Sequence, residues 1–419
     1  MWQDLKNKNL VVVKKGVRFL FRTFGIFKLN ETAEKVYAAH CLKKNAKTIN
    51  GSGEMRVAFI VYEPGMWDKQ LPIYEEMLKR EGLKPFIIVV PDNASSPQVQ
   101  EKKRDFFLNN YENVILYDEN TLNRFKKGEF HYAFYQTPYN FKYPKKIRPI
   151  KLVRHAKLCF VPYGYIGSKE FFEVSSKDDF FRNIYFGFMD SESMYELLRD
   201  NYSKHCERGY KNFEFLGYPA FEDYIGLKGS ESIKNVLWLP RWSYAEKGGG
   251  SHFLEHKDEY NRFAFENKDV SFTMRPHPLM FESLANQELF SREEALVYRK
   301  EAAEAKVHID EHSLPSESLG NTDLLIADYS SLIVMYFLTG RPVIYCDGGI
   351  ELSGIYEQLY KFMYIAKSWE EAERIAKEII KGNDPLKAER EKAAEEIAKK
   401  HKNAAKRITD RICEDFKLR

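Results

Sequence analysis

The fold is decided by one stretch of the chain, LLIADYSSLIVMYFLTGRPVIYC (324–346). A buried strand is predicted to end at Asp328, an apolar helix to begin near Ser330 or Ser331, and a second strand to follow. Strand, crossover helix and strand form the βαβ unit of a parallel sheet. Either serine is a good N-cap. The same helix N-terminus is suited to bind an anion, with Asp328 orienting the groups there or accepting from a ligand hydroxyl.

The same alternation of strand and helix extends along most of the chain. Before the turn-forming residues 217–232, we predict a helix at 69–81 and strands at 56–62, 85–90, 114–117, 132–135, 158–161 and 213–216. After them, we predict strands at 235–240, 270–274, 307–309, 324–327 and 342–346. The pattern favours an α/β protein with two Rossmann-like, doubly wound domains that face a cleft. We expect the N-terminal domain at 54–220, the C-terminal domain at 231–380 and solvated helices at 384–419.

Composition narrows the class of protein. The chain has 419 residues, which favours two domains, and 44% of them are hydrophobic, which is enough for two cores. The five cysteines form no C-x-x-C pair, so we expect a reducing, cytoplasmic setting. Neither a signal peptide nor an apolar run of the ~20 residues that span a bilayer is recognised. The net charge is only +4, and no nucleic-acid partner is predicted.

The N-terminal residues 1–50 are expected to form a basic, amphipathic helical segment. Within 10–27, Lys14, Arg18 and Arg22 recur every four residues, with apolar side chains on the neighbouring faces. One interpretation is an interfacial helix that lies on the anionic inner face of a membrane. The other is a helix packed on the body of the protein.

A second motif, Arg275-Pro276-His277-Pro278, follows the strand predicted at 270–274. Two prolines hold the chain stiff where it offers an arginine and an imidazole. At the carboxyl end of a strand, His277 can hydrogen bond a phosphate oxygen and Arg275 adds positive charge. The alternative is a rigid turn in which the histidine caps a backbone group.

The two motifs together resemble those of the CDP-glycerol glycerophosphotransferase family, the enzymes of teichoic-acid and related capsule synthesis. RPHP is followed after about fifty residues by ADYSS, a helix and G-R-P-V-I-Y, in the family's order. The turn VLWLPRWSY (236–244) is similar to the family's Pro-Thr-Trp-Arg, with Pro240 and Trp242 matching. The resemblance covers 230–380 well and the first domain in outline.

The resemblance implies a GT-B-type architecture, in which two such domains face each other and the C-terminal one holds an activated donor. It implies that His277, Ser330 and Ser331 contact the donor diphosphate, and it extends to Asp328 as a donor-binding residue. Pro240 and Arg241 fall on the donor-binding turn, where Arg241 and Ser243 replace the threonine and arginine of the family.

The first domain departs further from the family, whose Trp-His-Gly motif supplies the general base. The corresponding stretch, VPYGYIGSKE (161–170), retains Gly164 and Lys169 on the acceptor side but has Tyr163 in place of the histidine. A tyrosine with a pKa of ~10 is a poor proton acceptor near neutral pH. The loop EPGMWDK (63–69) therefore offers Glu63 as a second candidate base and Asp68 as an acceptor-binding residue, the alternative being solvated loop acids with Asp68 as a helix cap.

These observations predict an enzyme that passes glycerol phosphate, or a similar polyol phosphate, from a CDP-activated donor to a hydroxyl of a lipid-linked glycan or capsule-like polymer. Two alternatives stay open: a GT-B glycosyltransferase that uses a nucleotide sugar, and a non-catalytic scaffold in a capsule complex. No cofactor and no metal site are expected. In GGGSHFLEH (248–256), His252 and His256 are four residues apart, but Glu255 does not occupy the position of the acid in H-E-x-x-H, so we expect a flexible loop and an ordinary helix.

Overall fold

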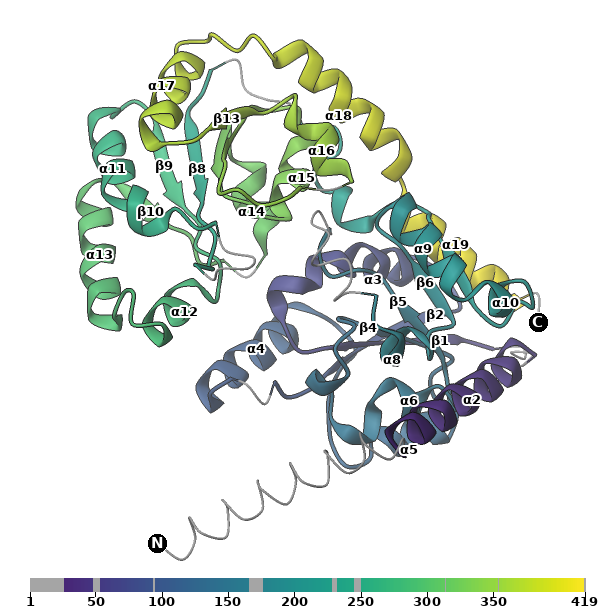
Figure 1. Ribbon diagram of the computed structural model, residues 1–419. Helices are drawn as coiled ribbons and strands as arrows, with labels where there is room; N and C mark the ends of the chain where they lie inside the picture. Colours follow the sequence, from purple (N-terminus) through teal and green to yellow (C-terminus); the bar gives the residue numbers. More distant parts are fainter. Residues whose placement is uncertain are drawn as a thin grey trace, which may run out of the picture.

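A computed structural model of the protein describes residues 26–47, 53–92, 95–165, 176–227, 232–244, 250–312, 314–352 and 354–417. It shows two lobes, each built on a parallel sheet with helices on its faces (Figure 1). We refer to the lobes as the first and second domains. The helix predicted at 10–27 lies outside the described residues except for its last two, and Lys169 lies outside them altogether.

The first sheet has seven parallel strands in the order β3-β2-β1-β4-β5-β6-β7. The strands are β1 (Met55–Val61), β2 (Leu83–Val89), β3 (Val114–Leu116), β4 (Tyr132–Tyr135), β5 (Lys157–Phe160), β6 (Phe186–Phe188) and β7 (Asn212–Glu214). The accompanying helices are α2 (Ile26–Ala46), η1 (Pro64–Lys69), α3 (Leu71–Leu78), α4 (Pro97–Asn110), α5 (Thr121–Lys126), η2 (Asn140–Lys142), η3 (Lys145–Ile147), α6 (Pro149–Leu152), α8 (Asp178–Phe181), α9 (Glu192–Asn201), α10 (Ser203–Cys206) and η4 (Pro219–Phe221).

The second sheet has six parallel strands in the order β10-β9-β8-β11-β12-β13. The strands are β8 (Asn235–Leu239), β9 (Ser271–Met274), β10 (Val307–Ile309), β11 (Leu324–Ala327), β12 (Val343–Cys346) and β13 (Tyr364–Ala366). The helices are α11 (Phe253–Glu266), α12 (Met280–Asn286), α13 (Arg292–Glu304), α14 (Pro315–Gly320), α15 (Leu332–Phe337), α16 (Ile355–Tyr360), α17 (Trp369–Ile380), α18 (Lys387–His401) and α19 (Ala404–Lys417).

The second sheet is buried on both faces, and its strands alternate accordingly. Val236 and Trp238 of β8 point into a core formed with α11, α13 and α17. Leu237 and Leu239 belong to the other core cluster, which continues into the first domain. The two domains therefore share apolar packing.

The C-terminal helices correct one expectation, because they are not solvated all round. Helix α18 leads away from the second domain, and α19 packs against α3 of the first (Figure 1). Ile408 and Ile412 of α19 are fully buried. Asp415 is buried as well, and it accepts hydrogen bonds from Lys157 Nζ at 2.5 Å and from the hydroxyl of Tyr132 at 2.6 Å. In the part of the chain that the structure describes, no helix is long and apolar enough to cross a membrane.

Candidate functional site

The sheet order brings the sequence motifs of the second domain to one edge. Strand β8 lies between β9 and β11, and all three are parallel, so their carboxyl ends are adjacent. RPHP follows β9, the Pro240–Trp242 turn follows β8, and Asp328–Ser331 follow β11. The chain order of the strands reverses between β8 and β11, which is the switch point where open α/β sheets bind ligands.

His277 is an exposed residue at this edge, and its ring lies 5.7 Å from that of Trp242. Its Nδ1 accepts a hydrogen bond from the backbone N–H of Leu279 at 3.1 Å. Poor solvation among the surrounding residues and, after it, the charge of Arg241 lower the pKa of His277, although the side chain reaches solvent. A neutral ring that accepts at Nδ1 carries its proton on Nε2, and this N–H is suited to donate to a phosphate oxygen.

Arg275 is not free to follow a ligand, because its guanidinium is held within the second domain. Nη1 lies 2.6 Å from a carboxylate oxygen of Asp310 and 3.1 Å from Ser318 Oγ, and Nη2 donates to the carbonyl of His312. These bonds connect the loop after β9 to the loop after β10. The predicted role of Arg275 in donor binding therefore has less support from the geometry than that of His277.

Asp328 is fully buried and its carboxylate is already engaged. Oδ2 accepts from the backbone N–H groups of Arg241 at 2.8 Å and His252 at 3.0 Å. Oδ1 lies 2.7 Å from Nδ1 of the His252 ring. Asp328 thus ties the end of β8 and the start of α11 to the end of β11, and it orients the site rather than presenting oxygens to a ligand.

Two serines precede α15, and the second of them, Ser331, lies beside the first domain. Ser330 Oγ accepts from the N–H of Leu332 at 3.3 Å, and Ser331 is the N-cap residue of α15 without a side-chain capping bond. A Cβ placed on Gly164 of the first domain would lie 3.7 Å from Ser331 Oγ. The carboxyl ends of β5 and β11 therefore approach each other, and the predicted donor and acceptor motifs meet there.

The turn after β8 completes this edge. Pro240 is buried at the end of the strand. The Arg241 side chain is also buried, with its guanidinium 5.0 Å from the ring centre of Tyr329 and Nη1 donating to the Tyr329 carbonyl at 3.1 Å. Burial lowers the pKa of Arg241. Asp328 binds the backbone N–H of Arg241 and the Tyr329 carbonyl binds its guanidinium, so both the main chain and the side chain are held in place.

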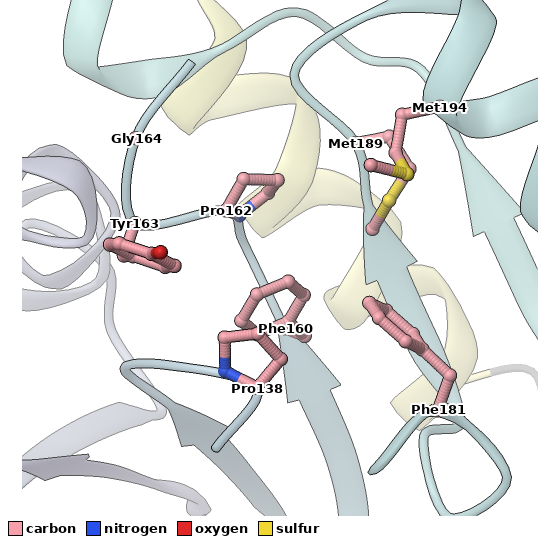
Figure 2. Close-up of a pocket in the computed structure, with 8 residues that line it drawn as sticks. All are labelled: Pro138, Phe160, Pro162, Tyr163, Gly164, Phe181, Met189 and Met194. Atoms are coloured by element: carbon pink, nitrogen blue, oxygen red, sulfur yellow. The ribbon is translucent and has the colours of Figure 1, made fainter. Parts of the chain in front are cut away.

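On the first domain, Tyr163 lies beside a small apolar cavity at the end of β5 (Figure 2). The lining also includes Pro138, Phe160, Pro162, Gly164, Phe181, Met189 and Met194. The cavity measures about 10 Å³, which is room for no more than a water molecule. The hydroxyl of Tyr163 lies 2.6 Å from that of Tyr139, whose ring in turn lies 5.9 Å from the exposed Phe141.

The two acids after β1 are both ion-paired. Glu63 lies 2.7 Å from Lys103 Nζ, which also contacts Asp92 at 2.9 Å. Asp68 is buried in η1 beside Lys69, 2.5 Å away, and does not cap α3. Burial raises the pKa of Asp68, and the contact with Lys69 opposes that shift. The interpretation of solvated loop acids is therefore wrong for Asp68.

Sequence reasoning missed one side chain at this edge. His252 contacts Asp328 with both its ring and its backbone, yet the residue order around it, which differs from H-E-x-x-H, suggested only a loop and an ordinary helix. The available signal was positional. A polar residue that begins the helix after β8 must lie near the switch point in a doubly wound sheet.

Comparison with known proteins agrees with this architecture. Two solved structures of UDP-N-acetylglucosamine 2-epimerases match with TM-scores of 0.53 and 0.55, at 12% and 10% identity. The first alignment covers 88% of this chain and 97% of the other; the second, from Neisseria meningitidis and bound to UDP-GlcNAc, covers 86% and 100%. The wall teichoic acid polymerase TagF, in a variant soaked with CDPG, matches with a TM-score of 0.55 at 14% identity over 93% of this chain and 98% of that one. No match was found among curated proteins.

Two parallel-sheet domains that meet at their carboxyl edges define a protein of the GT-B type. By sequence, residues 219–415 match the model of the CDP-glycerol:poly(glycerophosphate) glycerophosphotransferase family. The resemblance drawn from RPHP and ADYSS is confirmed.

Proposed function

We propose that the protein is a transferase that moves glycerol phosphate, or a similar polyol phosphate, from a CDP-activated donor to a hydroxyl of a lipid-linked glycan or teichoic-acid-like polymer. The observation that supports this most is the meeting of RPHP, the Pro240 turn and ADYSS on adjacent strands, within the residues that match the glycerophosphotransferase family. Residues 231–380 would bind the donor and residues 54–220 the acceptor.

The reaction requires the site to stabilise the charge on the leaving group and to position the donor and the acceptor. The acceptor oxygen forms a bond to the phosphorus that carries glycerol, the bond from this phosphorus to the bridging oxygen breaks, and CMP leaves with the bonding electrons. Negative charge develops on the leaving phosphate, and in this proposal the N–H of His277 and the hydroxyls of Ser330 and Ser331 stabilise it. Such transfer depends mainly on positioning and charge stabilisation.

The acceptor hydroxyl must also lose its proton. Tyr163 and Glu63 are the proposed groups, with Gly164, Lys169 and Asp68 on the acceptor side. Tyr163 is adjacent to Gly164, which faces Ser331, whereas the carboxylate of Glu63 is paired with Lys103. We expect Tyr163→Phe to slow transfer more than Glu63→Gln; the reverse order would assign the proton to the carboxylate.

The decisive experiment identifies the nucleotide released. Purified protein is incubated with CDP-glycerol, CDP-ribitol, or UDP- and GDP-sugars, together with a lipid-linked acceptor, and products are separated by chromatography. Transfer of a polyol phosphate releases CMP, whereas transfer of a sugar from a nucleotide sugar releases a nucleoside diphosphate. Release of UDP or GDP, with no CMP from any CDP compound, would replace the proposal by the glycosyltransferase alternative.

Residues 1–50 are proposed to hold the enzyme on the anionic inner surface of the cell membrane. The basic stripe at Lys14, Arg18 and Arg22 supports this. Deletion of residues 1–25 should abolish co-sedimentation with vesicles that contain anionic lipid and leave binding to neutral vesicles unchanged. Undiminished binding of the truncated protein to anionic vesicles would contradict the assignment.

A further inference from the structure

The start of α11 places a histidine against the buried carboxylate of Asp328. His252 precedes the helix, and its ring Nδ1 lies 2.7 Å from Asp328 Oδ1 while its backbone N–H donates to Oδ2. Asp328 has no exposed surface. This double attachment fixes both the main chain and the ring plane of His252 relative to the end of β11.

The attachment leaves the other side of the ring open. A carboxylate accepts hydrogen bonds, so Nδ1 of His252 carries a proton, and Nε2 lies on the opposite side of the imidazole. Nε2 makes no hydrogen bond to any of the residues described in the structure. The side chain is 20% exposed. An imidazole held at one nitrogen and open at the other is ready to donate a hydrogen bond to a ligand.

Charge at His252 is favoured by its surroundings. The hydrogen bond from the ring to Asp328 raises the pKa of His252, burial opposes this, and Glu255 on α11 and Asp347 after β12 add to the rise. The neighbouring ring of His256 stacks parallel at 5.0 Å. Burial and then repulsion from His252 lower the pKa of His256, so of the two rings His252 is the one whose charged form is favoured.

Other basic groups at this edge are less suited to meet an anion. His277 is neutral because its pKa is lowered. Arg275 is bound by Asp310, and the guanidinium of Arg241 lies against the ring of Tyr329 and donates to its carbonyl. A nucleoside diphosphate donor carries two negative charges that need a partner in a partly desolvated site.

We propose that His252 is a further donor-binding residue, whose Nε2–H donates to a phosphate oxygen of the nucleoside diphosphate while Asp328 holds the ring in place. The inference rests on the proposed function, and it assigns the two histidines different tasks. His277 offers a neutral hydrogen-bond donor after β9, and His252 offers a charged one on the β11 side of the switch point. Asp328 acts through His252 and is a positioning residue.

The test compares His252→Gln with His308→Gln, a matched change at an exposed histidine on β10. CDP-glycerol is titrated calorimetrically and cytidine by NMR, so that the phosphates are the only difference in charge between the ligands. We expect His252→Gln to weaken CDP-glycerol binding by about tenfold and cytidine binding little, because a charge-assisted hydrogen bond is lost. His308→Gln should match the wild type for both. Equal affinity for CDP-glycerol in wild type and His252→Gln, or an equal loss for both ligands, would overturn the inference.

The pH dependence supplies a readout that a merely structural role would not produce. A raised pKa keeps His252 charged to higher pH than a free imidazole, so CDP-glycerol affinity in the wild type should fall only as the pH rises past the range in which a free imidazole loses its charge. The phosphodiesters of CDP-glycerol stay ionised throughout. His252→Gln should lack this fall, and His252→Lys should retain affinity across the range. A wild-type profile without the fall contradicts the inference even if His252→Gln fails to fold. Absence of any binding of CDP compounds to the wild type would instead reject the proposed function.

Discussion

Single residues show how similar side chains acquire different tasks. His277 and His252 lie near the ends of neighbouring strands, but one meets a backbone N–H and the other a carboxylate. Poor solvation and Arg241 lower the pKa of the first, and Asp328 raises that of the second. Opposite shifts at one site are typical of groups that divide neutral and charged roles.

For His277 we expect a large loss on truncation. His277→Ala should reduce the rate of CMP release about 100-fold, because one donor to the developing charge is removed. His277→Gln keeps an N–H donor and should lose less. Since the pKa of His277 is lowered, its neutral form persists above about pH 6 and its contribution should not change from there to alkaline pH. Stopped-time assays of CMP release, carried out from about pH 6 to alkaline pH, measure the rates of the variants and their pH dependence. A His277→Ala enzyme as fast as the wild type would remove the residue from the donor site.

The sequence alone could place His277 and the serines, because they follow predicted strands directly. It could not assign Arg275, whose partners Asp310 and Ser318 are distant in sequence and come together only when β9 and β10 pair. His252 was missed for a related reason. The residue that holds it, Asp328, lies 76 positions away.

Among strands and helices, the longer elements were the easier to predict. The strands β1 and β2 were predicted, and so were the three-residue strands β3, β7 and β10, whereas the three-residue strands β6 and β13 were not. A strand of three residues carries little periodic pattern of its own, so sequence identifies some such strands and misses others. The charged composition of helix α19 favours a solvated helix, yet its isoleucines at 408 and 412 are spaced to share one face.

Helix α19 gives a prediction about stability. Asp415→Ala leaves Lys157 buried without its carboxylate and removes the acceptor for Tyr132 and Tyr185. We expect a loss of about 3–5 kcal/mol in the free energy of unfolding. Asp410→Ala on the same helix breaks pairs with Arg80 and Lys406 that are partly exposed, and should cost less than about 1 kcal/mol. Urea unfolding followed by tryptophan fluorescence measures both. Equal effects of the two substitutions would mean that the buried cluster adds no stability of its own.

The two domains pack together, and the loops after β5 and β11 approach each other at their junction. One core cluster runs through both, and Gly164 of the first domain faces Ser331 of the second. The fold class follows from the alternation of strands and helices along the sequence, and the carboxyl edge of the second sheet was predicted from the motifs that directly follow its strands. The distance between the domains does not follow from these patterns, because it depends on side chains packed across the junction.

Substitutions at Gly164 test whether transfer requires this close approach of the two domains. A Cβ there would lie 3.7 Å from Ser331 Oγ, an ordinary van der Waals separation, so Gly164→Ala should retain CMP release within about twofold of the wild type. Gly164→Leu would push further into the serine and hold the domains apart, and we expect at least about a tenfold loss in kcat. Gly320→Leu is the matched control, since a Cβ at Gly320 has no neighbour within 4 Å. If Gly164→Leu turned over as fast as this control, transfer would not require the observed approach of Gly164 to Ser331; a loss confined to Gly164→Leu would show that it does.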